Sequence, residues 1–436
     1  ALYSQNVDGN TNNIAVGAFA GYRNVTGTDN TYVGTSAGLG TAGGAVSNGY
    51  NVGIGSHALT AITDGISNVV IGRRAGDALT SGDANVFIGA DAGTSTLLVE
   101  NAVIIGKDAG GGVITNAAVG TVAVGHSALN ALTSGANNLA IGYLAGKTLT
   151  TGAQNLAIGR QALEFHLLGE SNIAIGYLAM GDTDAGTSSN DSDHNTFIGL
   201  LSGGGAWADV KSEYNVGVGN YTMNGALNGA LNNTAVGYYS LSALTTGDYN
   251  VAIGSSALIE NEDGSQNIAI GHLAGEHNTS GADVTSPDNC VIIGHSAWFS
   301  STTPTNQTVI GHEARGQADN SVVLGDDNVT AVYMAEDSGA TVHCESVTML
   351  NGAIGGTGNF FIADDSGYGF SFDAGGAFIY PGNSSGGVVD NTVDLGHGSY
   401  RFDDIFATNG TIQTSDQNEK QSIQSLTTAE MNVGKK

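Results

Sequence analysis

The chain has few charged residues and very few basic ones. Charged residues make up 12% of its 436 residues, and 40 acidic residues stand against 12 basic ones, giving a formal net charge of −28. A surface of this sign repels the phosphates of nucleic acids and of anionic membranes, so we expect neither as a partner. No run of eighteen apolar residues occurs, so we expect no insertion into a membrane as a helix.

Proline and cysteine are also scarce, with 3 and 2 residues. Two cysteines, Cys290 and Cys344, are too few for a disulfide framework, and we interpret both as packing residues. The 68 glycines do not recur at every third position, which excludes collagen. Apolar residues make up 41% of the chain and follow a strong period, which argues against disorder.

A phrase of seventeen residues recurs along most of the chain. Residues 138–154 read NLAIGYLAGKTLTTGAQ, and the next seventeen read NLAIGRQALEFHLLGES. Eighteen such phrases end an AIG-like stretch in glycine, from Gly17 to Gly325, and ten of the seventeen intervals between these glycines are 17 residues long. A short period kept over roughly 300 residues predicts a solenoid.

The columns of the repeat predict one β-strand before each of these glycines. The residue one before the glycine is always Val, Ile or Leu, the residue three before it is apolar or Thr, and the residue between is mostly small. This alternation is strand periodicity, and the glycine content argues against helices. We expect the branched pair to face the interior of the coil and the small column to pack against a sister chain.

Two further columns complete the predicted coil. Asn stands four before the glycine in thirteen coils, and Ala stands three after it in fourteen. Asn tolerates left-handed backbone, so it predicts a turn before the strand and a ladder of stacked amides. Each coil should thus contain a strand, a glycine corner, a short second strand and a turn such as LTTG.

Such coils should climb about 4.8 Å each, so the rod should be roughly 80 Å long. Their core is thin, which favours lateral packing in a homotrimer. The predicted fold class is all-β, with an N-terminal segment at 1–12, a trimeric parallel β-solenoid of about 17-residue coils at 13–325, and a β-rich stalk or small β domain at 326–392. The last of these is predicted from runs such as NFFIADD, GFSFD and AFIYPG.

The N-x-A-I-G-x-x-A units resemble the head repeats of YadA-like trimeric adhesins. The seventeen-residue version with LTTG turns resembles repeats in tail-fibre proteins of bacteriophages. The resemblance covers about residues 10–330, and it implies a left-handed parallel β-roll and a homotrimer.

The stretch RFDDIFATNGTIQTSD (401–416) resembles the junction that precedes an endosialidase-type intramolecular chaperone in phage tail fibres and tailspikes. The resemblance implies a pre-chaperone β segment at 393–414, the start of an incomplete chaperone at 415–436, and one-time cleavage of the Thr414–Ser415 bond. Ser415 would supply the hydroxyl, and Lys420 would act as its base. Only 22 residues follow Thr414, so we do not expect this chain to cleave itself.

Intervals longer than seventeen residues predict insertions, at 35–54, within 107–124, and at 177–198, 200–218 and 272–293. Insertions in solenoids form outer loops that often bind a partner. Trp207, Lys211 and Tyr214 share one insertion and are candidate receptor contacts, as is Trp298 at a repeat corner. The alternatives are a loop folded over its own apolar side chain for Trp207, and an end cover of the roll for Trp298.

Four histidines directly follow a strand-ending glycine, and near a three-fold axis one histidine per chain could form a metal site. They are His126, His272, His295 and His312. No H-x-H spacing occurs and the column is variable, so we expect no metal and no cofactor.

These observations favour a structural and host-recognition protein of a phage tail fibre, a trimeric β shaft that displays loops to a glycan or protein receptor on the host surface. Other tail proteins would bind one end, and the fibre would assemble in the host cytoplasm and be extracellular in the mature virion. We expect no enzyme, because no carboxylate pair can be nominated for a glycosidase. The alternatives are a bacterial trimeric surface adhesin and a tailspike that degrades host polysaccharide.

Overall fold

The computed structural model describes residues 11–41, 48–183, 191–330 and 332, and three strands between residues 360 and 383. The chain divides into two units, residues 1–333 and residues 334–436.

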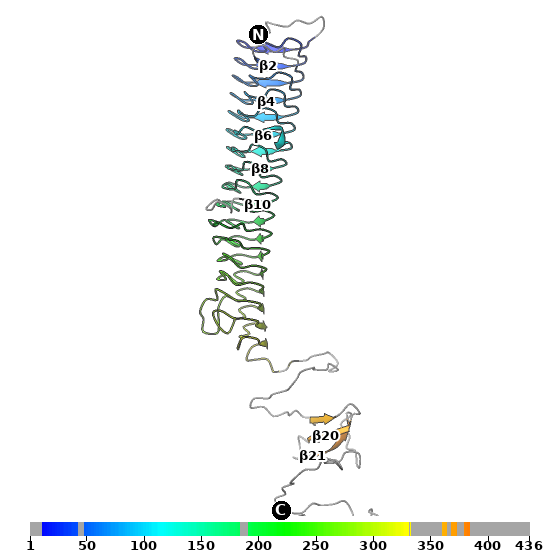
Figure 1. Ribbon diagram of the computed structural model, residues 1–436, viewed down its shortest axis with the longest axis vertical. Coiled ribbons are helices and arrows are strands. Elements are labelled where there is room, and N and C mark those ends of the chain that lie inside the picture. Colours follow the sequence, from blue (N-terminus) through cyan, green and yellow to red (C-terminus); the bar gives the residue numbers. More distant parts are fainter. Residues whose placement is uncertain are drawn as a thin grey trace, which may run out of the picture. The chain divides into compact units, whose positions relative to one another are not determined.

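The first unit is a stack of coils, each of which contributes one three-residue strand to a single parallel sheet (Figure 1). Each strand pairs in parallel with the strand of the next coil, as in the register Leu139↔Leu156 and Ile141↔Ile158. The predicted β-solenoid of about 17-residue coils is confirmed. The strands are β1 (Ile14–Val16), β2 (Thr31–Val33), β3 (Val52–Ile54), β4 (Val69–Ile71), β5 (Val86–Ile88), β6 (Val103–Ile105), β7 (Val122–Val124), β8 (Leu139–Ile141), β9 (Leu156–Ile158), β10 (Ile173–Ile175), β11 (Thr196–Ile198), β12 (Val216–Val218), β13 (Thr234–Val236), β14 (Val251–Ile253), β15 (Ile268–Ile270), β16 (Val291–Ile293), β17 (Thr308–Ile310) and β18 (Val322–Leu324).

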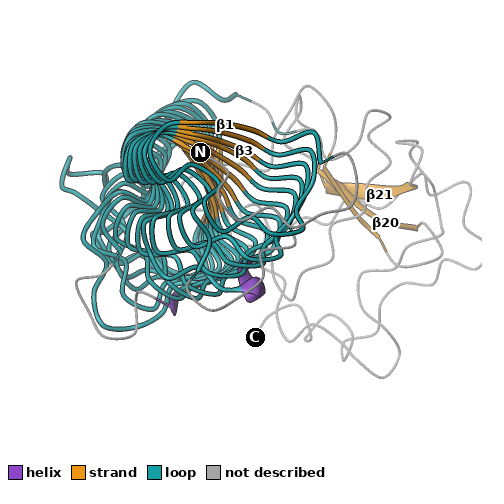
Figure 2. Ribbon diagram, turned by 90° about the horizontal axis from the view of Figure 1, so that it is seen from above, coloured by secondary structure: helices purple, strands orange, loops and turns teal. Residues whose placement is uncertain are grey.

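The rest of each coil consists of turns (Figure 2). The second short strand that we expected after the glycine corner does not form within the described coils. Turns replace it there because the residues after the glycine adopt left-handed backbone, which a strand does not contain. A single turn of 3₁₀ helix, η1 (Asn116–Ala118), lies between β6 and β7.

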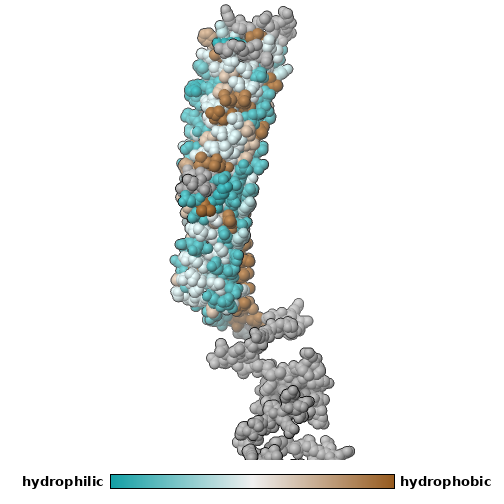
Figure 3. All heavy atoms as spheres, viewed as in Figure 1, coloured by the Kyte–Doolittle hydropathy of each residue, from teal (hydrophilic) through white to brown (hydrophobic). Residues whose placement is uncertain are grey.

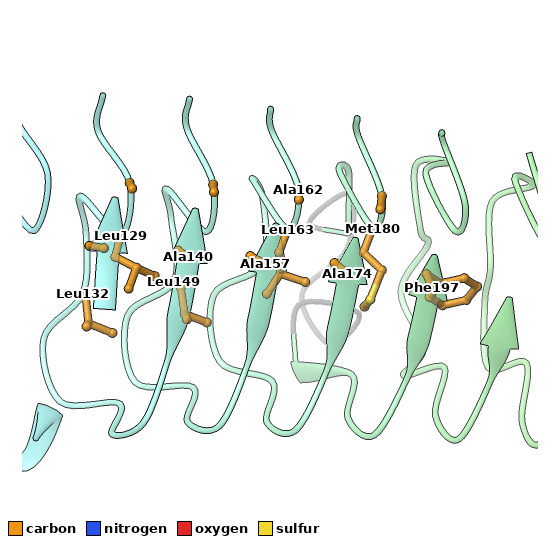
Figure 4. Packing of buried hydrophobic residues seen from close by; sticks show 14 of the residues in the cluster. Leu129, Leu132, Ala140, Leu149, Ala157, Ala162, Leu163, Ala174, Met180 and Phe197 are labelled. Atoms are coloured by element: carbon orange, nitrogen blue, oxygen red, sulfur yellow. The ribbon is translucent and has the colours of Figure 1, made fainter. Parts of the chain in front are cut away.

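The interior of the solenoid is filled by the middle residue of each strand, together with the alanine three residues after the glycine and the leucine of the turn (Figure 4). Ala140, Ala145 and Leu149 of one coil are all fully buried. Larger middle residues occur in some coils, where Tyr32, Phe87 and Phe197 are also fully buried. The core is therefore a narrow column of mainly small side chains.

The prediction of which strand face is interior was wrong. The branched residues on either side of the middle residue are half-buried or exposed in every one of the eighteen strands, whereas the small middle column is internal. The physical reason is the small cross-section of the coil. Seventeen residues enclose too little space for two branched side chains per strand in addition to the buried alanines and leucines.

The asparagine column forms the predicted ladder inside the coils. Asn68 Nδ2 donates to Asn51 Oδ1 at 3.0 Å and to the carbonyl of Gly82 at 2.8 Å, and the Asn68 backbone N–H donates to Asn51 Oδ1 at 2.9 Å. Equivalent bonds run through the coils from Asn195 to Asn267. These amides supply partners to backbone groups that the turns would otherwise leave buried and unpaired.

Each coil also depends on backbone of positive φ. Residues directly before the asparagine, such as Tyr214 (φ 59°), and residues two after the glycine, such as Leu144 (φ 58°), adopt the left-handed conformation. The glycine that follows each strand has a φ that only glycine adopts readily; for Gly142 it is 141°. A Cβ atom on Gly142 would meet the carbonyl of Gly159 in the next coil, so the close stacking of coils requires glycine there.

The second unit contains a three-stranded antiparallel sheet of β19 (Phe360–Ala363), β20 (Tyr368–Phe372) and β21 (Ile379–Asn383). These strands coincide with three of the runs from which we predicted strands in 326–392. The predicted segments 1–12 and 393–436 lie almost wholly outside the described residues.

Candidate binding surfaces

The branched residues of the eighteen strands form one continuous apolar strip, which we call the strand face. It consists of the residues one and three before each strand-ending glycine, and none of them is buried. Ile253 is 40% exposed, Ile270 38% and Val322 67%. Apolar side chains follow the right-hand edge of the lower coils in Figure 3, where Figure 1 shows the strands.

The strand face is larger than the apolar patches of ordinary monomers. With strands about 4.8 Å apart and a strip about 10 Å wide, it covers roughly 800 Å². The largest apolar patch on a soluble monomer is typically about 300–600 Å². Exposed apolar patches of this size are typical of protein–protein interaction surfaces.

The residue directly after each strand-ending glycine lies at one edge of the strand face, and we call these residues the trailing column. Ten of its eighteen members carry a ring or a long cationic side chain: Arg73, Lys107, His126, Tyr143, Arg160, Tyr177, Tyr238, His272, His295 and His312. All ten are exposed. The sequence marked this column only as variable.

Neighbouring members of the trailing column stack on one another from coil to coil. His126 stacks on Tyr143 with ring centroids 5.3 Å apart, and the Arg160 guanidinium lies 5.6 Å from the ring centroids of both Tyr143 and Tyr177. The parallel register produces this arrangement, because it places equivalent residues directly above one another.

Three histidines of the trailing column stack at the C-terminal end of the solenoid. The ring centroids of His272 and His295 are 5.2 Å apart, as are those of His295 and His312. Ligand atoms of His295, His312 and Glu313 lie within 4.8 Å of one another, the one such group of three found among the described residues. All three side chains are exposed.

Trp207, a predicted receptor contact, lies in the core instead. Its side chain is fully buried, packs edge-on against Phe197 at 5.9 Å between ring centroids, and donates from Nε1 to the carbonyl of Gly203 at 3.0 Å. The loop folds over its own indole, which was the alternative interpretation. We therefore correct this assignment, because a fully buried ring cannot contact a receptor.

The other two candidates from this insertion are at the surface. Lys211 Nζ lies 2.5 Å from a carboxylate oxygen of Asp191, and this contact raises the pKa of Lys211 above its ordinary value. Tyr214 is 52% exposed and stacks on His194 with ring centroids 5.1 Å apart. The two candidates remain available for contact.

Trp298 is half-buried near the C-terminal end of the solenoid. The Arg315 guanidinium lies 4.9 Å from the centroid of the indole, and His277 packs against it edge-on. Trp298 and Arg315 line a surface hollow together with Ser296 and Glu313.

One buried histidine replaces a core leucine. His166 stands where the preceding coils carry Leu132 and Leu149, and its side chain is fully buried. Its Nδ1 lies 2.9 Å from Thr183 Oγ1, and its Nε2 accepts from Asn172 Nδ2 at 3.1 Å. Burial lowers the pKa of His166 from 6.5 to about 4, although the charge of Asp191 opposes this shift. Sequence reasoning missed this residue; its one signal is a histidine in a column where the two preceding coils carry leucine.

Thr414, Ser415 and Lys420 lie outside the described residues, so their predicted role in cleavage stays a prediction.

Comparisons with protein-family models, curated proteins and solved structures gave no match to this chain. Within the described part of the chain, no helix is long and apolar enough to cross a membrane.

Proposed function

We propose that this chain is a trimeric β shaft of a bacteriophage tail fibre, which presents outer loops to a receptor on the host surface. The observation that carries the proposal is the strand face, an uncovered apolar strip along the full length of a solenoid. The resemblance of the repeats to tail-fibre repeats, and of residues 401–416 to a chaperone junction, supports the same function.

Three copies in parallel would cover this strip. A closed ring about an axis parallel to the rod buries the same face of every copy. The polar and charged residues at the edge of the strand face then form the rim of the interface, as in other protein–protein contacts.

The lengthened coils are the parts of the shaft that project from it and would meet a receptor. The coil between β15 and β16 bulges outward on the side away from the strands (Figure 1). Lys211 and the hollow beside Trp298 are the contacts that we assign to a glycan or protein receptor. A lysine ammonium group donates hydrogen bonds to hydroxyl, carbonyl or carboxylate oxygens, and an indole ring packs on apolar faces.

Light scattering on the purified chain tests the assembly. The expected mass is three times the 43.8 kDa of one chain. A stable monomer would contradict the trimeric shaft.

Attachment is tested with fluorescently labelled protein and a panel of bacterial strains. We expect labelling of a small subset of strains, removed by periodate if the receptor is a glycan and by protease if it is a protein. Release of oligosaccharide from purified capsule would instead favour a polysaccharide-degrading tailspike.

A further inference from the structure

The two edges of the strand face carry complementary side chains. The trailing column forms one edge, and the residue five before each strand-ending glycine forms the other, which we call the leading column. Four of the eighteen leading residues carry a ring, namely Tyr50, His194, Tyr214 and Tyr249, and none carries a cationic chain. The remaining leading residues are small or amide-bearing, except for Asp29.

A ring or a long cationic side chain never occupies both columns of the same coil. Opposite the four leading rings, the trailing residues are Ser56, Leu200, Asn220 and Ser255, and opposite the ten large trailing residues the leading residues are Gly, Ser, Asn or Gln. Independent placement of ten and four large residues over eighteen coils would make them coincide in about two coils. They coincide in none.

Contact within one chain does not account for this pattern. The leading and trailing residues of a coil are six positions apart across the strand, so their backbones are separated by up to about 20 Å. Tyr214, for example, stacks on His194 of the preceding coil, and Tyr143 stacks on His126 of the preceding coil. The exclusion therefore acts between surfaces that meet from different molecules.

We infer that in the assembled shaft the leading column of each chain packs against the trailing column of its neighbour, coil by coil at the same level. This inference rests on the proposed trimer and identifies its contacts. An axis parallel to the rod brings one edge of each strand face against the opposite edge of the next copy. Each level then holds at most one ring or long cationic side chain per contact. Its partner is a small or amide-bearing residue, or Leu200 at the level of His194.

The pairing fixes the axial register of the chains. In the correct register Tyr214 faces Asn220 of the neighbouring chain. A shift of one chain by a single coil would place Tyr214 against Leu200 in one direction and against Tyr238 in the other. At the Tyr238 level two rings would compete for one space. Tyr214 is thereby assigned to the contact between chains and not to the receptor.

Cysteine pairs test the inference, because Ala84 and Ala90 are the leading and trailing residues of one coil and are both small. In a Cys344→Ser background, the double variant Ala84→Cys with Ala90→Cys should form a covalent trimer under mild oxidation, seen on a non-reducing gel. Within one chain the two thiols are too far apart to bridge, since a disulfide needs Cα atoms within about 7 Å. Each single variant should stay uncrosslinked, because like columns do not meet.

A level-mismatched pair is the matched control. Ala84→Cys with Ala18→Cys combines the same two columns four coils apart and should give no cross-link. Two outcomes would overturn the pairing while leaving the trimer intact. In one, the protein is a trimer in light scattering but the variant with Ala84→Cys and Ala90→Cys does not cross-link. In the other, a single variant or the mismatched pair does cross-link. A covalent dimer as the end product would overturn the closed ring of three, and a monomer would overturn the proposed function itself.

A steric pair gives a second readout. Asn137→Trp should weaken the trimer, because it places two rings at the level of Tyr143, and adding Tyr143→Ala should restore it. Equal dissociation of the single and double variants would contradict the contact.

Discussion

Glycine at the strand end is the residue on which coil stacking depends most directly. In Gly142→Ala, the new methyl group would meet the Gly159 carbonyl and the backbone would keep a φ of 141°. We expect local destabilisation of more than about 2 kcal/mol, because strain of 1–2 kcal/mol adds to the clash. Hydrogen exchange of the peptide 138–154 measures it, since long repeat arrays do not unfold as one unit.

Gly281→Ala is the control for strain without a clash. Gly281 also has a positive φ, 79°, but a Cβ atom there would meet nothing within 4 Å. An equal loss of protection in both variants would show that the contact between coils is not the cause.

The buried imidazole of His166 should make its coil sensitive to acid. In the folded state the His166 side chain stays neutral down to about pH 4. In the unfolded chain the same side chain takes up a proton below its ordinary pKa of 6.5. Stability is therefore complete above pH 6.5 and falls as the pH drops from 6.5 toward 4, by up to about 3 kcal/mol. Hydrogen exchange of this coil as a function of pH measures the loss.

His166→Leu restores the core residue of the two preceding coils and removes the titrating group. We expect the variant to lose the acid sensitivity between pH 6.5 and 4 in this coil only. If the pH dependence is unchanged, a group other than His166 causes it.

At the scale of one coil, the asparagine ladder supplies hydrogen bonds that no other group can provide. Asn155 donates to the Gly169 carbonyl at 2.8 Å, and its Oδ1 accepts from the backbone N–H of Asn172 at 3.0 Å. In Asn155→Ala both buried groups lose a partner, and each costs about 1–3 kcal/mol. We expect faster exchange in the coils on both sides of β9, measured by mass spectrometry.

Thr151→Ala is the control in the same coil. Thr151 is an exposed turn residue that belongs to neither the leading nor the trailing column. We expect a change of less than about 0.5 kcal/mol, as for ordinary surface positions. A loss comparable to that of Asn155→Ala would contradict a special role for the ladder.

The strands could be predicted from the sequence because branched and small residues alternate before each glycine. This alternation indicates a strand, and the position of the glycine gives the alignment of successive coils. Alternation does not state which of the two faces is interior, and there the prediction was wrong. Side-chain volume would have identified the interior face. Most middle residues are small, but Tyr32, Phe87 and Phe197 occupy the same column, and a core whose width varies from coil to coil can hold either a small or a large residue there. The burial of Trp207 depends on a loop conformation that no periodicity encodes.

At the scale of the whole molecule, the strand face should decide whether chains assemble. Ile253→Lys combined with Ile270→Lys places two charges on it, at positions that are 40% and 38% exposed in the single chain. We expect loss of the trimer in light scattering without loss of the β signal in circular dichroism. Thr246→Lys, at an exposed turn residue away from the strands, should leave the trimer intact.

The strict parallel register also makes the chain modular. Removing residues 138–154 would join Asn137 to Asn155, so one complete coil disappears and the coils of β7 and β9 become neighbours in the same register. In the proposed trimer the same level would be lost from all three copies. Evolution can therefore change the length of this solenoid in increments of about 4.8 Å, by duplicating or deleting single repeats.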